Sequence, residues 1–236
     1  MNPALNASRF ASPIVELRQY TLKPGQRETL IALFDREFVE TQEATGMTVI
    51  GQFRDLDRPD MFVWLRGFED MTARKNALTA FYDGPVWAAH KDAANATMID
   101  SDDVLLLKPA WRGAEFDLRP AAAEAKSMSD DRRLPGFVEI SIHHLQPGTE
   151  ASFAERFRTE TLPQMTDGAQ VLAAFITERA ENTFPRLPVR AGETVFVAVT
   201  AAAGAAAPRG PSEYAAPEVT RTQTLRLAPT RRSLLG

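Results

Sequence analysis

The chain has 236 residues, of which 44% are hydrophobic and 25% are charged. This composition is typical of a globular protein and excludes an intrinsically disordered one. The net charge of −4 argues against a general nucleic-acid-binding protein, because neutralising phosphates requires clustered lysine and arginine. The absence of cysteine excludes disulfides, thiolate metal sites and a cysteine nucleophile.

After a lead-in at residues 1–13, the first half of the chain predicts alternating strands and helices. Residues 14–21 alternate in polarity and predict a strand, which Pro24 and Gly25 end. Large apolar residues recur every four positions from Leu30, which predicts a helix over 26–44. The other predicted elements of this half are strands at 47–54, 61–68 and 103–108, a helix at 71–81 capped by Asp70, and a helix at 85–98 with Pro85 in its first turn. This β-α-β-β-α-β order is that of a ferredoxin-like unit.

The second half repeats the first. Residues 14–25 read IVELRQYTLKPG and residues 137–148 read FVEISIHHLQPG, and matched positions keep a constant offset (138 − 15 = 123). Three further blocks align in the same order, namely VIGQF with VLAAF, FVWL with FVAV, and LLLKP with LRLAP. We therefore predict a tandem duplication, with units at 14–110 and 137–230 joined by a linker at 111–136.

The elements of the second unit follow from the same patterns. The predicted strands are 137–144, 169–177, 194–201 and 220–227, with a helix at 150–165 and an inserted loop at 179–192. Three prolines in 202–218 predict that the second helix of this unit is replaced by a loop.

Alternation within the strands predicts which side chains share a face of each sheet. We expect the apolar face, which includes Val15, Leu17 and their repeat partners Val138 and Ile140, to lie beneath the helices. The opposite face carries ionisable and aromatic residues and is expected to be free of helices. Its members are Glu16, Arg18, Tyr20, Trp64 and Arg66 in the first unit and Glu139, Ser141 and His143 in the second.

Two such uncovered faces can close against each other into an eight-stranded barrel, which has room for packed side chains or one small ligand. Glu16 and Arg66 would lie on neighbouring strands and are expected to pair, because a buried charge needs a partner. Two interpretations remain open. The charged residues form either a structural ion-pair network or a ligand pocket with an arginine anchor and walls of Trp64 and Tyr20.

The stretch FYDGPVWAAHKDAANATMIDSDDVLLLKP at 81–109 resembles the C-terminal signature of NIPSNAP domains, and VELRQYTLKPG at 15–25 resembles their first strand and turn. The resemblance covers about 14–110. It implies a dimeric α/β-barrel, an α+β fold in which two ferredoxin-like units pack sheet to sheet. It implies little about chemistry, because members of this family mostly lack an assigned reaction. Nothing in the second unit matches YDGPVWAAH, so a site made by this signature would occur once per chain.

Within the signature, Trp87 and His90 are three residues apart and can share a helix face. Either Trp87 packs the helix onto the sheet and His90 satisfies a carbonyl or carboxylate, or His90 is a general base or a donor to a ligand. No catalytic residue is assigned. The candidate ligand-binding residues are Arg18, Tyr20, Trp64, Arg66, Trp87 and His90.

Three classes of function remain. The leading expectation is a NIPSNAP-type barrel that binds a small-molecule ligand or acts through assembly, with no cofactor and no metal, since HExxH, Walker, GxGxxG and GxSxG motifs are absent. The alternative is a cofactor-independent monooxygenase or isomerase acting on a small aromatic or polyketide-like substrate in the barrel cavity. A haem-binding barrel is a third possibility, with His143 as axial ligand.

The sequence shows no signal peptide and no apolar run near the ~20 residues that span a bilayer. We therefore expect a cytoplasmic protein without membrane or nucleic-acid partners. A homo-oligomer is expected. The barrel could close within one chain or between two chains, and the duplication favours closure within one chain.

Overall fold

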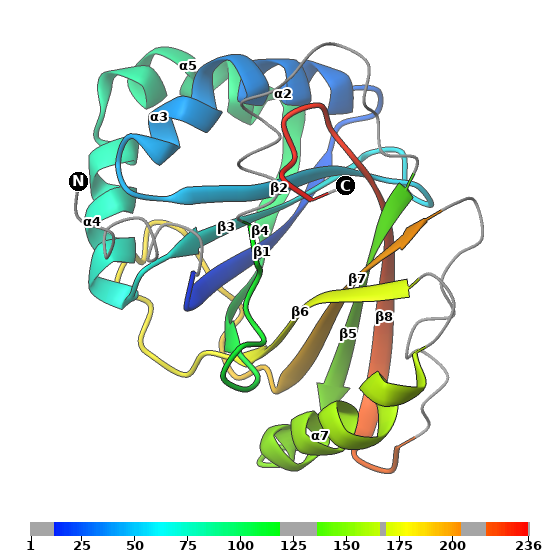
Figure 1. Ribbon diagram of the computed structural model, residues 1–236. Helices are drawn as coiled ribbons and strands as arrows, with labels where there is room; N and C mark the ends of the chain where they lie inside the picture. The colour runs from blue at the N-terminus through cyan, green and yellow to red at the C-terminus, as the bar shows by residue number, and fades with distance from the viewer. Residues whose placement is uncertain (1–11, 119–135, 166–168, 204–215, 236) are drawn as a thin grey trace, which may run out of the picture.

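The computed structural model describes residues 12–118, 136–165, 169–203 and 216–235. Its strands form one closed barrel in the order β1-β3-β2-β8-β5-β7-β6-β4 (Figure 1). The strands are β1 (Ile14–Leu22), β2 (Thr48–Asp55), β3 (Met61–Phe68), β4 (Met98–Pro109), β5 (Gly136–Leu145), β6 (Ala169–Thr177), β7 (Val195–Ala203) and β8 (Val219–Pro229). Among the described residues, no helix combines the length and the apolar character needed to cross a bilayer.

Each half of the barrel has the strand order of a ferredoxin-like unit. In the first half β1 lies between β3 and β4, and β2 lies beside β3. In the second half β5 lies between β7 and β8, and β6 lies beside β7. The halves join where β2 pairs with β8 and β4 pairs with β6. The predicted α+β fold of two ferredoxin-like units is therefore confirmed, and the barrel closes within one chain.

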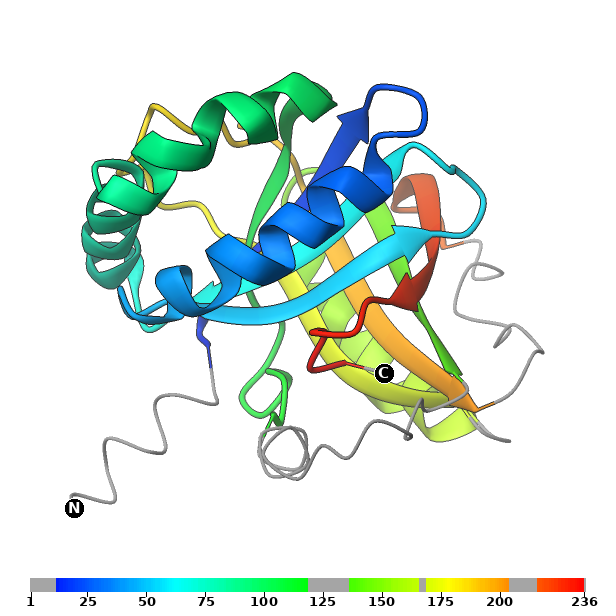
Figure 2. The ribbon, with the colours of Figure 1, turned by 90° about the horizontal axis from the view of Figure 1, so that it is seen from above.

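Helices cover the outside of both halves (Figures 1 and 2). The first half carries α2 (Arg27–Leu33), the π-helical turn η1 (Phe34–Phe38), α3 (Val39–Glu43), α4 (Met71–Tyr82) and α5 (Pro85–Thr97). The second half carries α7 (Glu150–Arg156), the π-helical turn η2 (Phe157–Thr161) and the 3₁₀ turn η3 (Leu162–Gln164). Helix α4 begins where the Asp70 carboxylate accepts a hydrogen bond of 2.7 Å from the Ala73 amide, as the capping pattern predicts.

The two halves share backbone irregularities as well as sequence. The π-helical turns start at Phe34 and Phe157, and these positions differ by the offset of the sequence repeat (157 − 34 = 123). Gly25 and Gly148 also match, with φ of 75° and 83°, a conformation that glycine adopts without the steric cost of a Cβ. The loop predicted at 202–218 falls largely on residues 204–215, which lie outside the described part of the chain.

The structure reverses the predicted faces of the sheet. Val15 and Leu17 point into the barrel, where they pack with Val138 and Ile140 from the other half in one apolar cluster. The face that was expected to be uncovered lies beneath the helices instead: Tyr20 and Trp64 share a second cluster with helical residues such as Phe34. The prediction that the apolar faces are covered by helices is therefore wrong.

The size of the barrel explains this reversal. An eight-stranded barrel has an interior just wide enough for side chains to fill it. Aliphatic residues from all eight strands fill it here, and Phe116, Leu118 and Leu235 pack against them. Large side chains such as Trp64 and the arginines lie in the thicker layer between sheet and helices, where longer side chains can extend.

The helix-covered side of the second half buries a histidine. His143 lies against the rings of Phe153 and Phe196, and its Nδ1 lies 3.1 Å from the Thr222 hydroxyl. Its Nε2 has no hydrogen-bond partner among the described residues. Burial, assisted by the charge of His144, lowers the pKa of His143 to about 4.

This histidine makes the stability of the fold depend on pH. The unfolded chain binds a proton at His143 near pH 6.5, whereas the folded chain does so only near pH 4, so the contribution is present above pH 6.5 and is lost on acidification. We expect His143 by itself to lower the free energy of unfolding by about 2 kcal/mol between pH 7 and pH 5. Urea titrations of the wild type and of His143→Gln measure it, and the fall between these pH values should be smaller in the variant by about this amount.

Phe157→Leu serves as the matched control, because Phe157 packs on Phe196 in the same apolar cluster and its ring contacts do not include His143. It should lower stability at every pH and keep the slope. A His143→Gln variant whose slope equals that of the wild type would contradict the assignment.

Candidate functional site

One carboxylate is shared by three arginines between the sheet and the helices of the first half. Glu16 on β1 accepts hydrogen bonds from Arg18 Nη1 at 2.7 Å, from Arg66 Nε on β3 at 2.8 Å and from Arg74 Nε on α4 at 2.7 Å. All four side chains are at most 1% exposed. We call these four residues the arginine cluster. The predicted pairing of Glu16 with Arg66 is confirmed, and the two residues are also direct partners in the β1–β3 register.

The outward sides of the three guanidinium groups contact neutral groups. Arg18 Nε donates to the Tyr20 hydroxyl at 3.0 Å. Arg66 Nη1 donates to the Gln42 side-chain oxygen at 3.1 Å, and Arg74 Nη1 donates to the Asn182 side-chain oxygen at 3.0 Å. These contacts satisfy N–H groups but add no negative charge. Three cations against one anion therefore leave a surplus of two positive charges (3 − 1 = 2).

Several buried N–H groups in this layer have no hydrogen-bond acceptor among the described residues. They are Trp64 Nε1, Arg66 Nη2 and Arg74 Nη2. The last of these lies 2.7 Å from a Glu16 oxygen, but only the Nε of Arg74 meets hydrogen-bond geometry with that oxygen. Buried polar groups are ordinarily paired, so unpaired donors beside a surplus of positive charge mark an unusual environment.

The electrostatics of the arginine cluster fix its protonation state. Burial by itself would raise the pKa of Glu16, but the charges of Arg66, Arg18 and Arg74 hold it well below its usual value. Burial lowers the pKa of Arg74, and its contact with Glu16 opposes this shift. Burial also raises the pKa of the Tyr20 hydroxyl, which keeps that hydroxyl neutral. Glu16 is therefore ionised at neutral pH and Tyr20 is not.

Aromatic rings surround the guanidinium groups. Arg18 lies over Tyr20 and Trp64, with its central carbon 5.4 and 5.6 Å from the ring centres. Arg66 lies over Trp64 at 5.1 Å and over Tyr82 at 5.9 Å. Such contacts stabilise a cation through the negative face of the ring. Planar aromatic rings and positively charged guanidinium groups therefore lie side by side in this layer.

The structure brings four of the six predicted ligand-binding residues together. Arg18, Tyr20, Trp64 and Arg66 lie in this layer, although the layer is on the helix side of the sheet and not inside the barrel. The remaining two lie on α5. Trp87 is partly buried against Phe38, Phe81 and Tyr82, so it borders the layer through Tyr82.

His90 belongs to a different contact. Its side chain is 31% exposed, and its Nε2 lies 3.4 Å from a Glu37 carboxylate oxygen. Its ring also contacts Phe38. This arrangement is the carboxylate contact that one of the two interpretations of His90 predicts. Its role as a ligand-binding residue stays a prediction.

Sequence reasoning missed Arg74, Gln42 and Asn182. Arg74 had a local signal, because it occupies the apolar stripe of α4 that continues with Ala77, Leu78 and Phe81. Asn182 had none, since it lies 108 positions from Arg74 in a loop of the other half. Long-range contacts of this kind follow from topology and not from local pattern.

The second half keeps the carboxylate and loses the arginines. Glu139 takes the position of Glu16, but Ser141 replaces Arg18, and Thr200 lies opposite Glu139 where Arg66 lies opposite Glu16. Burial raises the pKa of Glu139, in contrast to that of Glu16. His143 replaces Tyr20 beneath α7 and does not enter the apolar barrel interior, where an axial ligand to a haem in the barrel would lie.

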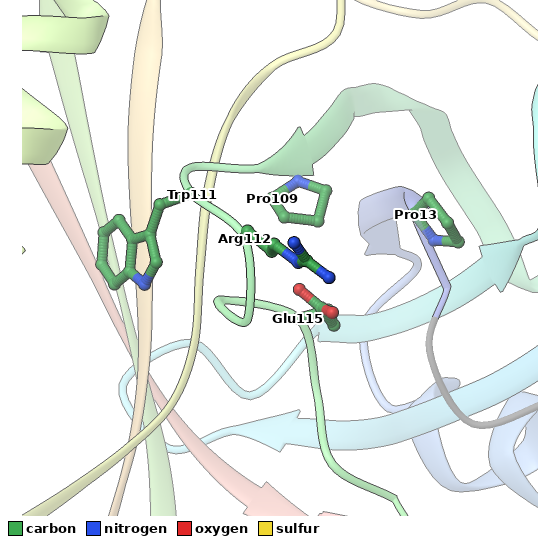
Figure 3. A pocket seen from close by; sticks show the side chains of 5 residues that line it. All are labelled: Pro13, Pro109, Trp111, Arg112 and Glu115. Carbon is green, nitrogen blue, oxygen red and sulfur yellow. The ribbon is translucent and has the colours of Figure 1, made fainter. Parts of the chain in front are cut away.

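A surface pocket of about 280 Å³ is lined by Pro13, Pro109, Trp111, Arg112 and Glu115, and Figure 3 shows the Arg112 and Glu115 side chains pointing toward each other between the two prolines. Arg112 is exposed, so this pocket lacks a buried anchor. In the described ranges, no three His, Asp or Glu side chains gather as a metal site.

Residues 15–111 match the NIPSNAP family model. The crystal structure of a "putative monooxygenase" from Lactobacillus acidophilus superposes with a TM-score of 0.55 at 12% identity, covering 92% of this chain and 94% of its own. That of a second "putative monooxygenase", from Fusobacterium nucleatum, gives 0.56 at 10% identity, covering 93% of each chain. At these identities the likeness concerns the fold.

The comparison with curated proteins gives no match. The family match covers the strands and helices that build the arginine cluster, apart from Asn182. It ends two residues after β4, before the second half begins. Residues 15–111, which form β1 to β4 and the helices between them, are therefore similar to NIPSNAP domains, and this similarity covers less than half of the chain.

Proposed function

We propose that this protein binds a small anionic molecule at the arginine cluster of its first half. The observation that carries the proposal is the surplus of two buried positive charges beside unpaired N–H donors. A network whose only role is structural would be expected to balance its charges, because each unpaired buried ion costs several kcal/mol. An anion entering this layer would supply both the missing charge and the missing acceptors.

The aromatic surroundings favour a planar ligand. Trp64, Tyr20 and Tyr82 present ring faces and edges beside the guanidinium groups, which match carboxylate and phosphate groups in a bidentate manner. Room for the ligand would come from displacement of Asn182 and Phe184, which lie against Arg74 and Tyr82 in a segment without helix or strand. The six predicted residues, with Trp87 and His90 at the border, remain the proposed ligand-binding set.

The enzymatic alternative has less support. It places a substrate in the barrel cavity, but aliphatic and phenylalanine side chains pack in the described barrel interior, and Gln19 and Gln223 hydrogen-bond to each other across it. Arg18, Tyr20 and Trp64, which the alternative requires as cavity walls, lie outside the barrel beneath the helices. We therefore propose binding without assigning a reaction.

Assembly and location complete the proposal. We expect a cytoplasmic protein that forms a homo-oligomer, although the barrel needs no second chain to close. The part of β4 at Met98–Asp103 carries exposed side chains, including Ile99 at 64% exposure, beside acidic residues. Charges on an edge strand oppose direct strand pairing between copies, so the contact would use another surface. Sedimentation velocity measures the stoichiometry.

Ligand charge should decide binding. We expect benzoate to bind and benzamide, which has the same shape without the charge, not to bind at matched concentration. Trp64 Nε1 is an unpaired donor in the layer, so its indole N–H resonance should move during the benzoate titration. Arg74→Gln should weaken benzoate binding by at least about tenfold, since one buried cation is removed.

Arg226→Gln is the matched control, because it removes an exposed arginine that pairs with Asp57 elsewhere on the protein. It should bind benzoate as the wild type does. Wild-type protein in which benzoate and benzamide leave the Trp64 resonance equally unchanged would refute the proposal, and this readout does not depend on whether a variant folds.

The two equivalent carboxylates should differ in their contribution to stability. Glu16→Gln leaves three buried arginines without a counter-ion, and we expect it to lower the free energy of unfolding by about 3–5 kcal/mol. Glu139→Gln removes a carboxyl whose pKa is raised by burial and should cost about 1 kcal/mol or less. Urea unfolding at pH 7 measures both variants, and equal costs would show that the arginine cluster is not held by Glu16.

A further inference from the structure

A loop of the second half covers the arginine cluster of the first. Residues 178–194, which connect β6 to β7, run across to β4 and α4 (yellow segment in Figures 1 and 2). We call this segment the covering loop. Its backbone is fixed to β4 by hydrogen bonds from the Glu178 amide to the Leu106 carbonyl at 2.8 Å and from the Arg190 amide to the Val104 carbonyl at 2.9 Å. The first half therefore receives part of its site from the second.

Asn182 is the residue of the covering loop that reaches a buried cation. Its side-chain oxygen accepts from Arg74 Nη1 at 3.0 Å and from the Phe184 amide at 3.1 Å. Its side-chain nitrogen donates to the Leu187 carbonyl at 2.9 Å. All three contacts agree on which atom of the amide is the oxygen, so its orientation is well determined. Phe184 packs on Tyr82 beside it and holds the loop in the apolar layer.

The choice of asparagine at this position has an electrostatic meaning. An aspartate would make the same contact with Arg74 as a charge-assisted hydrogen bond and would remove one of the surplus positive charges. The outward contacts of the arginine cluster are instead to neutral acceptors, namely the side-chain oxygens of Tyr20, Gln42 and Asn182 and the sulfur of Met47. None of these contacts therefore reduces the surplus of two positive charges.

Resting on the proposed function, we infer that the ligand of the arginine cluster is a small dianion, either a dicarboxylate or a phosphate monoester. Two negative charges bring the four charged residues to neutrality, whereas a monoanion leaves one buried positive charge uncompensated. Asn182 sets this preference. In the absence of ligand, its uncharged amide oxygen accepts the hydrogen bond from Arg74. When the ligand binds, a ligand oxygen replaces it as the acceptor.

The experiment changes the charge of the site by one unit, through Asn182→Asp, and the charge of the ligand by one unit, through the choice of anion. Calorimetric titrations at pH 7.5 compare benzoate, phthalate and phenyl phosphate against the wild type and Asn182→Asp. The wild type should bind at least one of the two dianions about tenfold or more tightly than benzoate. In Asn182→Asp this preference should fall at least tenfold, because a tethered carboxylate now supplies one of the missing charges.

Arg179→Gln is the matched control on the same loop. Arg179 pairs with Glu150 on α7, and its printed hydrogen bonds, to Glu150 and Thr194, do not involve the arginine cluster, Asn182 or Phe184. It should leave the preference for dianions unchanged. Phthalate and phenyl phosphate separate the two sources of a dianion, since the one that binds more tightly identifies the chemical class.

The outcomes distinguish the two proposals. Wild-type protein that binds none of the three anions refutes the proposed function itself. Wild-type protein that binds benzoate as tightly as both dianions keeps the anion site and refutes the dianion. A preference that is the same in Asn182→Asp as in the wild type refutes the role of Asn182.

Discussion

The charged layer of the first half depends on a single buried carboxylate. Glu16 accepts a hydrogen bond from each of three arginines that come from two strands and a helix, and so it fastens β1, β3 and α4 together. The arginines in turn need the carboxylate, because a buried guanidinium without a counter-ion is unstable. The aromatic rings pack around the planar guanidinium groups. Asn182 of the covering loop accepts a hydrogen bond from one of these groups, that of Arg74. The geometry of the proposed ligand site is therefore the geometry around this one side chain.

The barrel rests on a different principle from the layer outside it. Its interior is built from aliphatic side chains of both halves, and it has no need for the charged residues that distinguish the first half. This separation allows two halves with the same strand order to differ in chemistry. The second half replaces an arginine by Ser141 and a tyrosine by His143, and the strands still pair in the matching register.

Most of the fold could be predicted from the sequence, because the signals are local and occur twice. The repeat of Val15, Glu16, Pro24 and Gly25 at a fixed offset defines two related units, and the alternation and capping patterns place the strands and helices within a few residues. The faces could not be assigned. Both faces of β1 are buried, so alternation separates two sets of residues without showing which set meets the helices.

The site could be predicted only in part, for the same reason. Glu16, Arg18, Trp64 and Arg66 lie on two adjacent strands, and strand order places them together. Arg74 could be found only as a charged residue within the apolar stripe of α4. Asn182 could not be found, because the sequence does not show that its loop crosses to the first half. The charge balance of the layer, which carries the functional argument, emerges only when all of these residues are in place.

The covering loop has a consequence for how the two halves divide their work. A half that contributes its share of the barrel interior and one loop to its neighbour does not need a binding site of its own. It can drift in composition as long as it continues to buttress the first half and to hold Asn182 in position. Cutting the chain between the halves would thus remove more than a structural support: the isolated first half would keep its arginines and lose the Asn182 contact to Arg74.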